Sequence, residues 1–449
     1  MTLTNTPLVR TEQMSGRAGW VWDTFATSVL MPTYLLALTI TDYSSVKGRY
    51  NVTVWADSKE VAEVEGTFAL ELAPRVLEYF AHTFGIEYSL PKLDMMAVPS
   101  KGGAAMENWG LVLFDQQSLL IDLDADESEV GNILEHKYHV MEVVAHELAH
   151  QWFGNLVTLK WWSDTWLQEG LACYCSMIAQ DALEPDSRAM ERGLVERTLQ
   201  VMRVDTGGRH RSMASPITSR SDIHSVFGPI AYSKGYALMM MLESILGRST
   251  LLRGLSLYLV RHAYSNAQGS DLFTALEEAA REDGRWPQGD LDSLLVTMQR
   301  WTHQAGLPLI TATLNNGSLT ISQEPFLPPR LCDLSCTQVG SSTGHVSVND
   351  FSVNCQQGLC SHQDQSVDLC EVMKSPCGSN STVEEVVWDV PITWMEVEEE
   401  ENMAANWTEK EEQWTEELLP TWLSNKSMQV EVPPGTLPLL NKLGVGYYR

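Results

Sequence analysis

The chain has 449 residues, of which 44% are hydrophobic, so it is long enough to bury a sizeable core and to form two or three domains. Its formal net charge of -28 argues against nucleic acid and against an anionic membrane surface as partners. The same charge fits a soluble extracellular surface, and an acidic cavity would attract substrates that carry a free ammonium group.

The first predicted elements are strands. Residues 28–42 include an apolar run at 29–40 that is short and broken by Pro32, so strand is predicted there rather than a membrane span. No transmembrane span or signal peptide is predicted in this chain. A boundary follows near residues 46–48, after which residues 50–55 begin an alternating strand.

The middle of the chain is predicted to be helical and the end to be strands. Helices are expected from their apolar spacing at residues 61–84, 138–153, 164–182, 184–202, 231–246, 249–262, 271–282 and 291–304. After residues 306–308 the pattern changes, and strands at 309–314 and 319–322 predict a small β-sandwich.

One predicted helix carries a metal-binding pattern. His146 and His150 are four residues apart, so both imidazoles lie on one helix face and can reach one Zn²⁺. Glu147 follows the first histidine and reaches a water on the metal rather than the metal itself. Glu169 is the third ligand if the chain turns after Gly154 and a second helix runs back past the first. Three protein ligands leave one position to water, which is typical of a catalytic zinc site.

Two core histidines on an amphipathic helix are the alternative explanation of this pattern. That arrangement would leave unpaired imidazoles and a carboxylate among apolar residues, which costs free energy without a metal or another partner. The two-histidine pattern alone also occurs by chance, and the partnered Glu169 makes the metal site the favoured interpretation.

Three stretches of the sequence resemble the zinc aminopeptidases of the aminopeptidase N type. The first runs from His-Glu-Leu-Ala-His-Gln-Trp-Phe-Gly-Asn at 146–155 through Trp-Trp-Ser-Asp at 161–164 to Gln-Glu-Gly at 168–170. The second, Ala-Met-Glu-Asn-Trp-Gly at 105–110, resembles their exopeptidase motif. The third, Ile-Ala-Tyr-Ser-Lys-Gly at 230–235, resembles the segment with their catalytic tyrosine. The three occur in the family's order and at family-like separations.

The resemblance implies a catalytic role for each matching residue. His146, His150 and Glu169 would bind one zinc ion per chain, which lowers the pKa of its water and polarises the scissile carbonyl. Glu147 would take the proton of that water and pass it to the leaving amine. Tyr232 would hydrogen-bond the tetrahedral oxyanion. Without the motif, Tyr232 would be interpreted as an ordinary half-buried tyrosine.

A substrate-binding role is implied for Glu107 and its neighbours. The carboxylate of Glu107 would pair with the free α-ammonium group of a peptide, so that only the first peptide bond reaches the metal. Ala105, Met106 and Asn108 belong to the same motif, and Ala104 stands where the family has glycine. If that glycine has a positive φ or lets the substrate backbone approach closely, the methyl group of Ala104 narrows the cleft.

The resemblance also implies a fold and a domain organisation. A thermolysin-like zinc-peptidase domain of the α+β class is expected at residues 48–305, followed by a small β-sandwich at 306–449. Residues 1–47 are expected to be the remnant of an N-terminal β-domain. The family's large C-terminal helical domain, and a glutamine that contacts the substrate amine, have no counterpart in this sequence.

The function implied is that of a zinc-dependent metallo-aminopeptidase, which hydrolyses the N-terminal peptide bond of peptides with a free α-amine. A non-catalytic ectodomain fragment that binds peptides or forms a homodimer is the main alternative, and an endopeptidase is a second one, against which Glu107 argues. The presence of Glu147, Tyr232 and three ligands favours the enzyme. Membrane attachment would need an N-terminal anchor that this chain lacks.

The location of the protein is predicted from its glycosylation signals. An extracellular or cell-surface protein that follows the secretory route is indicated by five Asn-x-Ser/Thr sequons, at Asn51, Asn316, Asn380, Asn406 and Asn425.

Six of the eight cysteines gather in an insertion at about residues 330–380. Three disulfides are expected there, in any of fifteen pairings, among Cys332, Cys336, Cys355, Cys360, Cys370 and Cys377. A second zinc site with His345 or His362 is the alternative, although no Cys-x2-Cys pair is present. Cys173 and Cys175 are two residues apart on a predicted helix and are expected to be packing residues.

Overall fold

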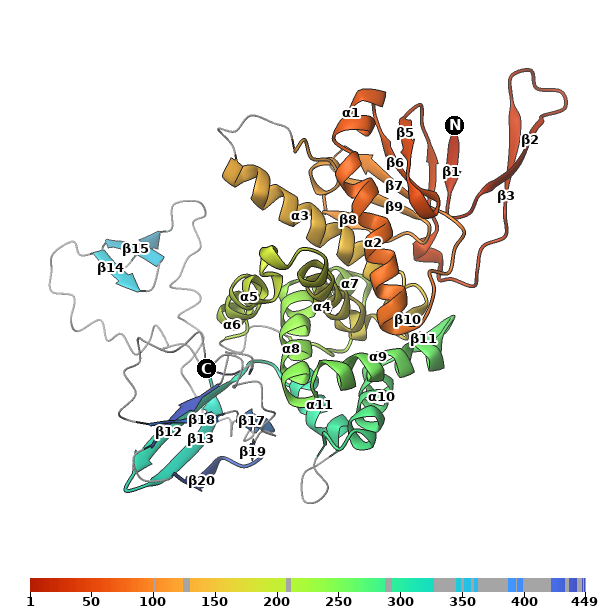
Figure 1. The fold of residues 1–449 in the computed structure, drawn as a ribbon. Helices are drawn as coiled ribbons and strands as arrows, with labels where there is room; N and C mark the ends of the chain where they lie inside the picture. Colours follow the sequence, from red (N-terminus) through yellow and green to blue (C-terminus); the bar gives the residue numbers. More distant parts are fainter. Residues whose placement is uncertain are drawn as a thin grey trace.

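The computed structural model describes residues 1–99, 102–123, 130–206, 211–286, 293–326, 345–348, 351–356, 359–361, 387–392, 394–398, 421–432 and 436–441, with Gly446 and Tyr448. Figure 1 shows strands at the N-terminal end, helices in the centre and further strands at the C-terminal end. This mixed α/β architecture confirms the coarse fold prediction. Within the described ranges, none of the helices has the length and apolar character that crossing a membrane requires.

The first forty residues form two antiparallel strand pairs, β1 with β4 and β2 with β3. Their bounds are β1 Thr2–Thr4, β2 Leu8–Gln13, β3 Val21–Phe25 and β4 Leu38–Ile40. The strand predicted at residues 28–42 is therefore only partly right, because the 3-10 turn η1 (Thr33–Leu35) precedes β4. This turn follows Pro32, whose fixed φ and missing amide hydrogen suit the start of a helical turn.

A five-stranded sheet follows, in the order β5-β6-β7-β9-β8. Its strands are β5 Ser44–Lys47, β6 Val52–Ala56, β7 Leu93–Val98, β8 Ala105–Met106 and β9 Leu111–Asp115. The three central strands are parallel, and β5 and β8 are antiparallel edge strands. The strand predicted to begin at residues 50–55 is confirmed by β6, and all five of its residues are buried. One face of β6 packs on helices, and Trp55 on the other face packs against Met96 and Leu111.

Four helices lead from the sheet to the centre of the molecule. Their bounds are α1 Lys59–Val64, α2 Thr67–Phe84, α3 Val130–Ala149 and α4 Thr165–Leu183. The single helix predicted at 61–84 is divided, because the amides of Glu65 and Gly66 both donate to the carbonyl of Val61. α3 starts before the predicted residue 138 and ends before residue 153, because Gln151 and Trp152 donate to carbonyls only three residues back.

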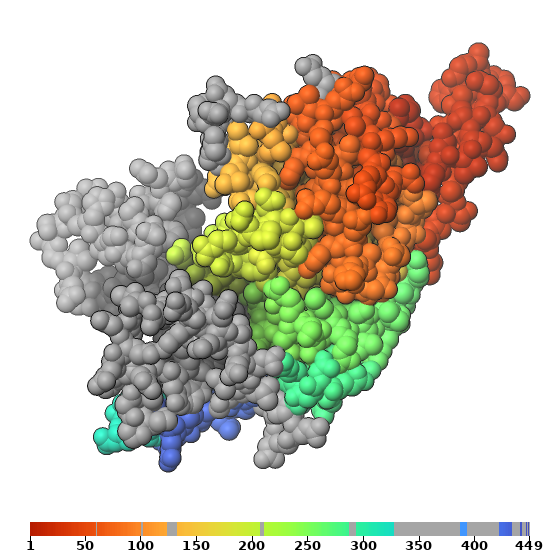
Figure 2. Space-filling model, viewed as in Figure 1, coloured from red at the N-terminus to blue at the C-terminus, as the bar shows by residue number. Residues whose placement is uncertain are grey.

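Of the remaining helices, those at residues 189–193 and 230–246 pack against α4, and the helix at 248–262 packs against α2, where the green and orange surfaces meet in Figure 2. Their bounds are α5 Ala189–Gly193, η7 Leu194–Leu199, α6 Gln200–Val204, α7 Arg220–Val226, η8 Ile230–Lys234, α8 Gly235–Leu246, α9 Arg248–His262, α10 Gly269–Glu282 and α11 Leu294–His303. Single turns and short strands connect them: η2 Arg49–Asn51, η3 Gln116–Ser118, η5 Trp162–Asp164, η6 Pro185–Ser187, β10 Val157–Leu159 and β11 Ser265–Ala267. The helices predicted after residue 231 agree with η8 to α11 within a few residues. The helix predicted at 184–202 consists of η6 and then α5, η7 and α6, of which η7 is a π-helix.

The C-terminal part consists of strands. β12 Pro308–Asn315, β13 Ser318–Pro325 and β20 Ser427–Glu431 form one antiparallel sheet, which contains both strands predicted from the sequence. The others are β14 His345–Val348, β15 Phe351–Gln356, β16 Leu359–Ser361, β17 Val390–Ile392, β18 Trp394–Glu398, β19 Thr421–Leu423 and β21 Thr436–Leu440. The register of β15 and β16 places Cys355 opposite Cys360. Cys332, Cys336, Cys370, Cys377, His362, Asn380 and Asn406 lie outside the described residues.

A buried ion pair connects η8 to the start of the C-terminal strands. Lys234 Nζ lies 2.7 Å from Asp205 Oδ2, and neither side chain is more than 1% exposed. Lys234 also donates to the carbonyl of Gly306, whose amide donates to Asp205. Burial lowers the pKa of Lys234, and the carboxylate of Asp205 opposes this shift. The pair therefore fixes the turn η8 relative to the chain segment that leaves the helical region.

Replacing Lys234→Met should lower the free energy of unfolding by about 3–5 kcal/mol, because it removes the cation that faces the buried Asp205 carboxylate. The matched control is Lys59→Met, which removes an exposed pair with Glu63 and should cost about 0–1 kcal/mol. Urea unfolding of both variants measures the difference. Equal losses in the two variants would contradict the expectation.

Candidate metal centre

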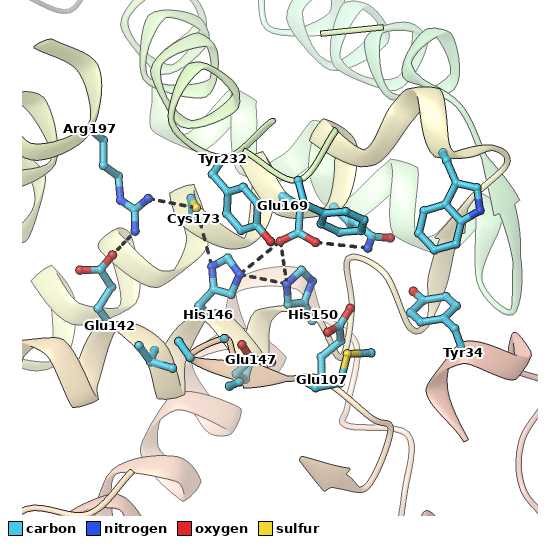
Figure 3. A pocket seen from close by; sticks show the side chains of 18 residues that line it. Tyr34, Glu107, Glu142, His146, Glu147, His150, Glu169, Cys173, Arg197 and Tyr232 are labelled. Carbon is cyan, nitrogen blue, oxygen red and sulfur yellow. Dashed lines mark hydrogen bonds and ion pairs between the residues drawn. The ribbon is translucent and has the colours of Figure 1, made fainter. Parts of the chain in front are cut away.

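The helices α3 and α4 bring the three predicted ligands together, as Figure 3 shows. His146 lies in the last turn of α3, His150 directly follows it, and Glu169 lies near the start of α4. His146 Nε2 is 3.0 Å from His150 Nε2, and each of these nitrogens is 3.4 Å from Glu169 Oε2. The turn after Gly154 and the return of a second helix therefore occur as the sequence predicts.

This donor set fits a zinc ion. Ligand atoms about 2.0–2.2 Å from a tetrahedral ion lie roughly 3.3–3.6 Å from one another, close to the observed separations. Two imidazoles and a carboxylate are the ligand types of catalytic zinc sites, and three protein ligands leave a position for solvent or substrate. Among the described residues, no other group of His, Cys, Asp and Glu converges in this way.

The electrostatic field around the ligands favours a bound cation. Burial by itself lowers the pKa of His150, but the carboxylates of Glu107, Glu169 and Glu147 together raise it to about 10. Burial opposes the ionisation of Glu169, yet the two histidines hold its pKa well below the usual range. Burial also lowers the pKa of His146. Carboxylates that favour a positive charge on a buried imidazole would favour a divalent cation in the same place.

The turn after α3 fixes both His150 and Glu107. His150 Nδ1 lies 2.9 Å from the carbonyl oxygen of Phe153, which leaves Nε2 to face the metal site. Asn155 donates from Nδ2 to the backbone carbonyl of Glu107 at 2.9 Å. Gly154 has φ 127°, a conformation that favours glycine, and a Cβ there would lie 3.3 Å from His150 Nδ1. The residues that follow the second histidine are thus part of the site.

A close contact between α4 and α8 places Tyr232 beside the ligands. A Cβ on Gly170, next to Glu169, would lie 2.7 Å from the Cα of Gly235. Because both residues are glycine, the turn η8 can lie directly against α4. The ring of Tyr232 stacks on His146, with centroids 6.0 Å apart and planes at 14°. Burial, and then the charge of Glu169, raises the pKa of the Tyr232 phenol well above its ordinary value, so it remains a hydrogen-bond donor.

A cavity of about 680 Å³ lies over the three ligands, and Glu107, Glu147 and Tyr232 all line it. Glu147 is 5% exposed and Glu107 is 7% exposed, so both carboxylates belong to the cavity wall rather than to the outer surface. In Figure 3, Glu107 lies on the side of His150 and Glu142 lies beyond His146. The predicted site residues from three distant stretches of sequence therefore meet in one place.

The predicted substrate-binding residues lie on the edge strand β8 and directly beside it. Ala104, Ala105 and Met106 line the cavity, and Ala104 is exposed. Asn108 is buried and donates to the backbone carbonyl of Tyr34 at 3.4 Å, so it supports the wall from behind. In the described part of this loop it is Gly102, with φ 84°, that has the left-handed conformation.

Part of the cavity wall consists of residues that were not predicted from the sequence. On one side, the rings of Tyr34 and Phe227 both pack against Trp162. On the other side are Glu142, Cys173 and Arg197. Tyr34 belongs to the turn that was predicted to be strand, and neither Phe227 nor Arg197 belongs to a recognisable motif.

The two cysteines of α4 differ in their surroundings. Both are buried free thiols, as expected for packing residues. Burial raises the pKa of Cys173 to about 12, so its thiol is neutral at pH 7. The packing prediction is incomplete for Cys173, because this residue also lines the cavity and its Sγ lies 3.7 Å from His146 Nδ1.

The chain is similar in sequence to known peptidases. The family model described as "Peptidase family M1 domain" matches residues 68–302. The thyrotropin-releasing hormone-degrading ectoenzyme of Mus musculus is 37% identical over 317 residues, which are 69% of this chain and 29% of that protein. Aminopeptidase N of Bos taurus is 36% identical over 70% of this chain and 32% of its own length. Human glutamyl aminopeptidase is 36% identical over 72% of this chain and 32% of its own length. The chain thus spans about a third of the length of the curated relatives it matches.

Proposed function

The chain belongs to peptidase family M1, the family of aminopeptidase N, and we propose that it is a zinc-dependent aminopeptidase that acts on peptides with a free α-amine. The observation that carries this proposal is the convergence of a ligand triad, Glu107, Glu147 and Tyr232 in one cavity. Each of these groups has the chemistry that one part of the reaction requires.

His146, His150 and Glu169 would hold one zinc ion per chain. Bound there, zinc supplies a Lewis acid that polarises the scissile carbonyl and makes a water molecule more acidic. The carboxylate of Glu147 lines the same cavity but is not part of the ligand triad. It acts as the general base that takes a proton from the attacking water, and then as the acid that gives a proton to the leaving amine.

Glu107 and Tyr232 determine which bond is cut and how its transition state is stabilised. The buried carboxylate of Glu107 pairs with the α-ammonium group of the substrate, which places the first peptide bond at the ligand triad. The phenol of Tyr232 donates a hydrogen bond to the oxyanion that develops on the scissile carbonyl. These roles favour an exopeptidase over an endopeptidase, because a substrate cut at an internal peptide bond has no ammonium group beside that bond to pair with Glu107.

We also propose a domain organisation for the chain. We infer a thermolysin-like arrangement at residues 48–305, a small β-sandwich at 306–449 and the end of a preceding β-domain at 1–47. Of the described sequons, Asn51, Asn316 and Asn425 are exposed, which is consistent with glycosylation in the secretory route. One matching relative is named an ectoenzyme, so we propose an extracellular or cell-surface location and peptide substrates for this chain.

A direct test is to purify the chain, measure its zinc content, and compare amino-terminal amide substrates with their N-acetylated forms. We expect about one zinc per chain and chelator-sensitive cleavage of the free amines alone. Stoichiometric zinc without turnover would favour the alternative of a peptide-binding form. Cleavage of the acetylated substrates would favour an endopeptidase.

Replacing Glu107→Gln should lower kcat/KM for free-amine substrates about 30-fold, because a buried pair of opposite charges is worth about 2 kcal/mol or more. The preference for free amines over acetylated substrates should fall by the same factor. Glu71→Gln is the matched control at an exposed glutamate and should change neither value. Zinc content should be equal in all three proteins. An unchanged preference in the Glu107→Gln protein would remove the amine-binding role.

A further inference from the structure

One end of the cavity wall has no role in the proposed reaction. Glu142 from α3, Cys173 from α4 and Arg197 from η7 line the cavity beyond His146, on the opposite side from Glu107. None of the three is part of the ligand triad. Their contacts with one another and with His146 nevertheless form a continuous series, which Figure 3 shows as dashed lines.

Arg197 connects the other two residues. Its Nη2 donates to the carboxylate of Glu142, and its Nη1 donates to Cys173 Sγ at 3.3 Å. The side chains of Arg197 and Glu142 are 18% and 19% exposed, and Cys173 is fully buried. A guanidinium group held by a carboxylate and directed at a sulfur is pre-organised, because its planar fork engages two partners at once.

Cys173 in turn contacts the first ligand, since its Sγ lies 3.7 Å from His146 Nδ1. A histidine that binds a metal through Nε2 carries its proton on Nδ1 and needs an acceptor there. His150 has a strong acceptor, the carbonyl oxygen of Phe153 at 2.9 Å. His146 has a sulfur, which is a weak acceptor. The two histidine ligands are therefore oriented by different kinds of partner.

We propose that Glu142, Arg197 and Cys173 act as a positioning network that orients the ring of His146 for the metal. Arg197 fixes the sulfur, Glu142 fixes Arg197, and the sulfur accepts the Nδ1 proton of His146. The ring of Tyr232 stacks on the His146 ring. When the network orients His146, it therefore also positions the imidazole ring against which Tyr232 stacks. The inference rests on the proposed function, because it concerns the zinc site of that function.

The test is the zinc affinity of the full chain, measured by competition with a chromophoric chelator, and it does not require turnover. Cys173→Ala should bind zinc about 10–100-fold more weakly, the usual effect of losing a partner of a metal-binding histidine. Cys175→Ala is the matched control, because Cys175 is an equally buried thiol of the same helix with no contact to His146 among its described interactions. It should bind zinc within about twofold of the unmodified chain. The visible spectrum of the cobalt-substituted proteins should shift in the Cys173→Ala protein alone.

A second variant keeps the proposal testable if Cys173→Ala does not fold. Arg197→Lys retains the positive charge but not the fork that engages two partners, and it should weaken zinc binding about threefold to tenfold. Equal zinc affinity of the Cys173→Ala and Cys175→Ala proteins, or of the Arg197→Lys and unmodified proteins, would overturn the positioning network and leave the proposed function intact. Failure of the unmodified chain to bind zinc would overturn both.

Discussion

Replacing Glu147→Gln should leave zinc bound and lower kcat by about 10⁴-fold, the upper end of the range for a general acid–base group. A large loss is expected because the same carboxylate acts in two proton transfers, first from water and then to the leaving amine. The amide has nearly the same size and lines the same cavity, so the packing of the site should be preserved. Zinc stoichiometry and steady-state kinetics on an amino-terminal amide substrate measure both effects.

A control variant shows whether Glu147 acts as the general base or as a zinc ligand. Glu169→Ala removes a carboxylate whose Oε2 lies 3.4 Å from both histidine nitrogens, so this variant should lose zinc together with activity. Loss of zinc from the Glu147→Gln protein would mean that Glu147 is itself a ligand. Retention of most of the activity would mean that another group takes the proton.

The centre of the site could be predicted from sequence because each of its residues lies in a short local pattern. His146 and His150 share one helix face because they are four residues apart, and Glu169 lies in the first turns of the next long helix. Glu107 and Tyr232 are different, because nothing local links them to the histidines. They were placed through resemblance to a family, and the structure brings both into the cavity.

The rest of the wall could not be predicted because it depends on contacts between distant segments. Arg197 reaches Cys173 and Glu142 only because η7 packs against the other helices, and no spacing in the sequence encodes that contact. Tyr34 reaches the cavity because a 3-10 turn replaces the predicted strand. Tertiary packing also explains why both faces of β6 are buried, since its second face is covered by a cluster that includes Ala37 from the N-terminal segment.

The two glycines at the contact of α4 with α8 also could not be predicted to touch. Gly170 and Gly235 occur in separate motifs, and each could be interpreted as an ordinary helix residue. The structure shows that they touch, at a distance where a methyl group on either would collide with the other backbone. This contact determines how closely Tyr232 approaches the ligands. The loss of kcat expected when its hydroxyl group is removed depends on that approach.

Replacing Tyr232→Phe should lower kcat by about 10²–10³-fold and leave KM within about threefold, because a donor to an oxyanion acts in the transition state and not on the bound substrate. The aromatic ring that stacks on His146 remains, so zinc content should not change. The phenol is held protonated by burial and by Glu169, so the loss should be constant across pH 6–9 instead of following a titration.

Tyr236→Phe is the matched control for the loss of one hydroxyl group. Tyr236 is fully buried one helical turn further along and does not line the cavity, so its variant should retain kcat and KM. A transition-state analogue should bind the Tyr232→Phe protein more weakly by the same factor as the loss in kcat, while a simple substrate-like inhibitor should bind it equally well. If KM rises and kcat does not change, Tyr232 contributes to substrate binding and another donor in the cavity stabilises the oxyanion. Tyr34 is the candidate for that donor, because it lines the cavity and burial raises the pKa of its phenol, which stays protonated.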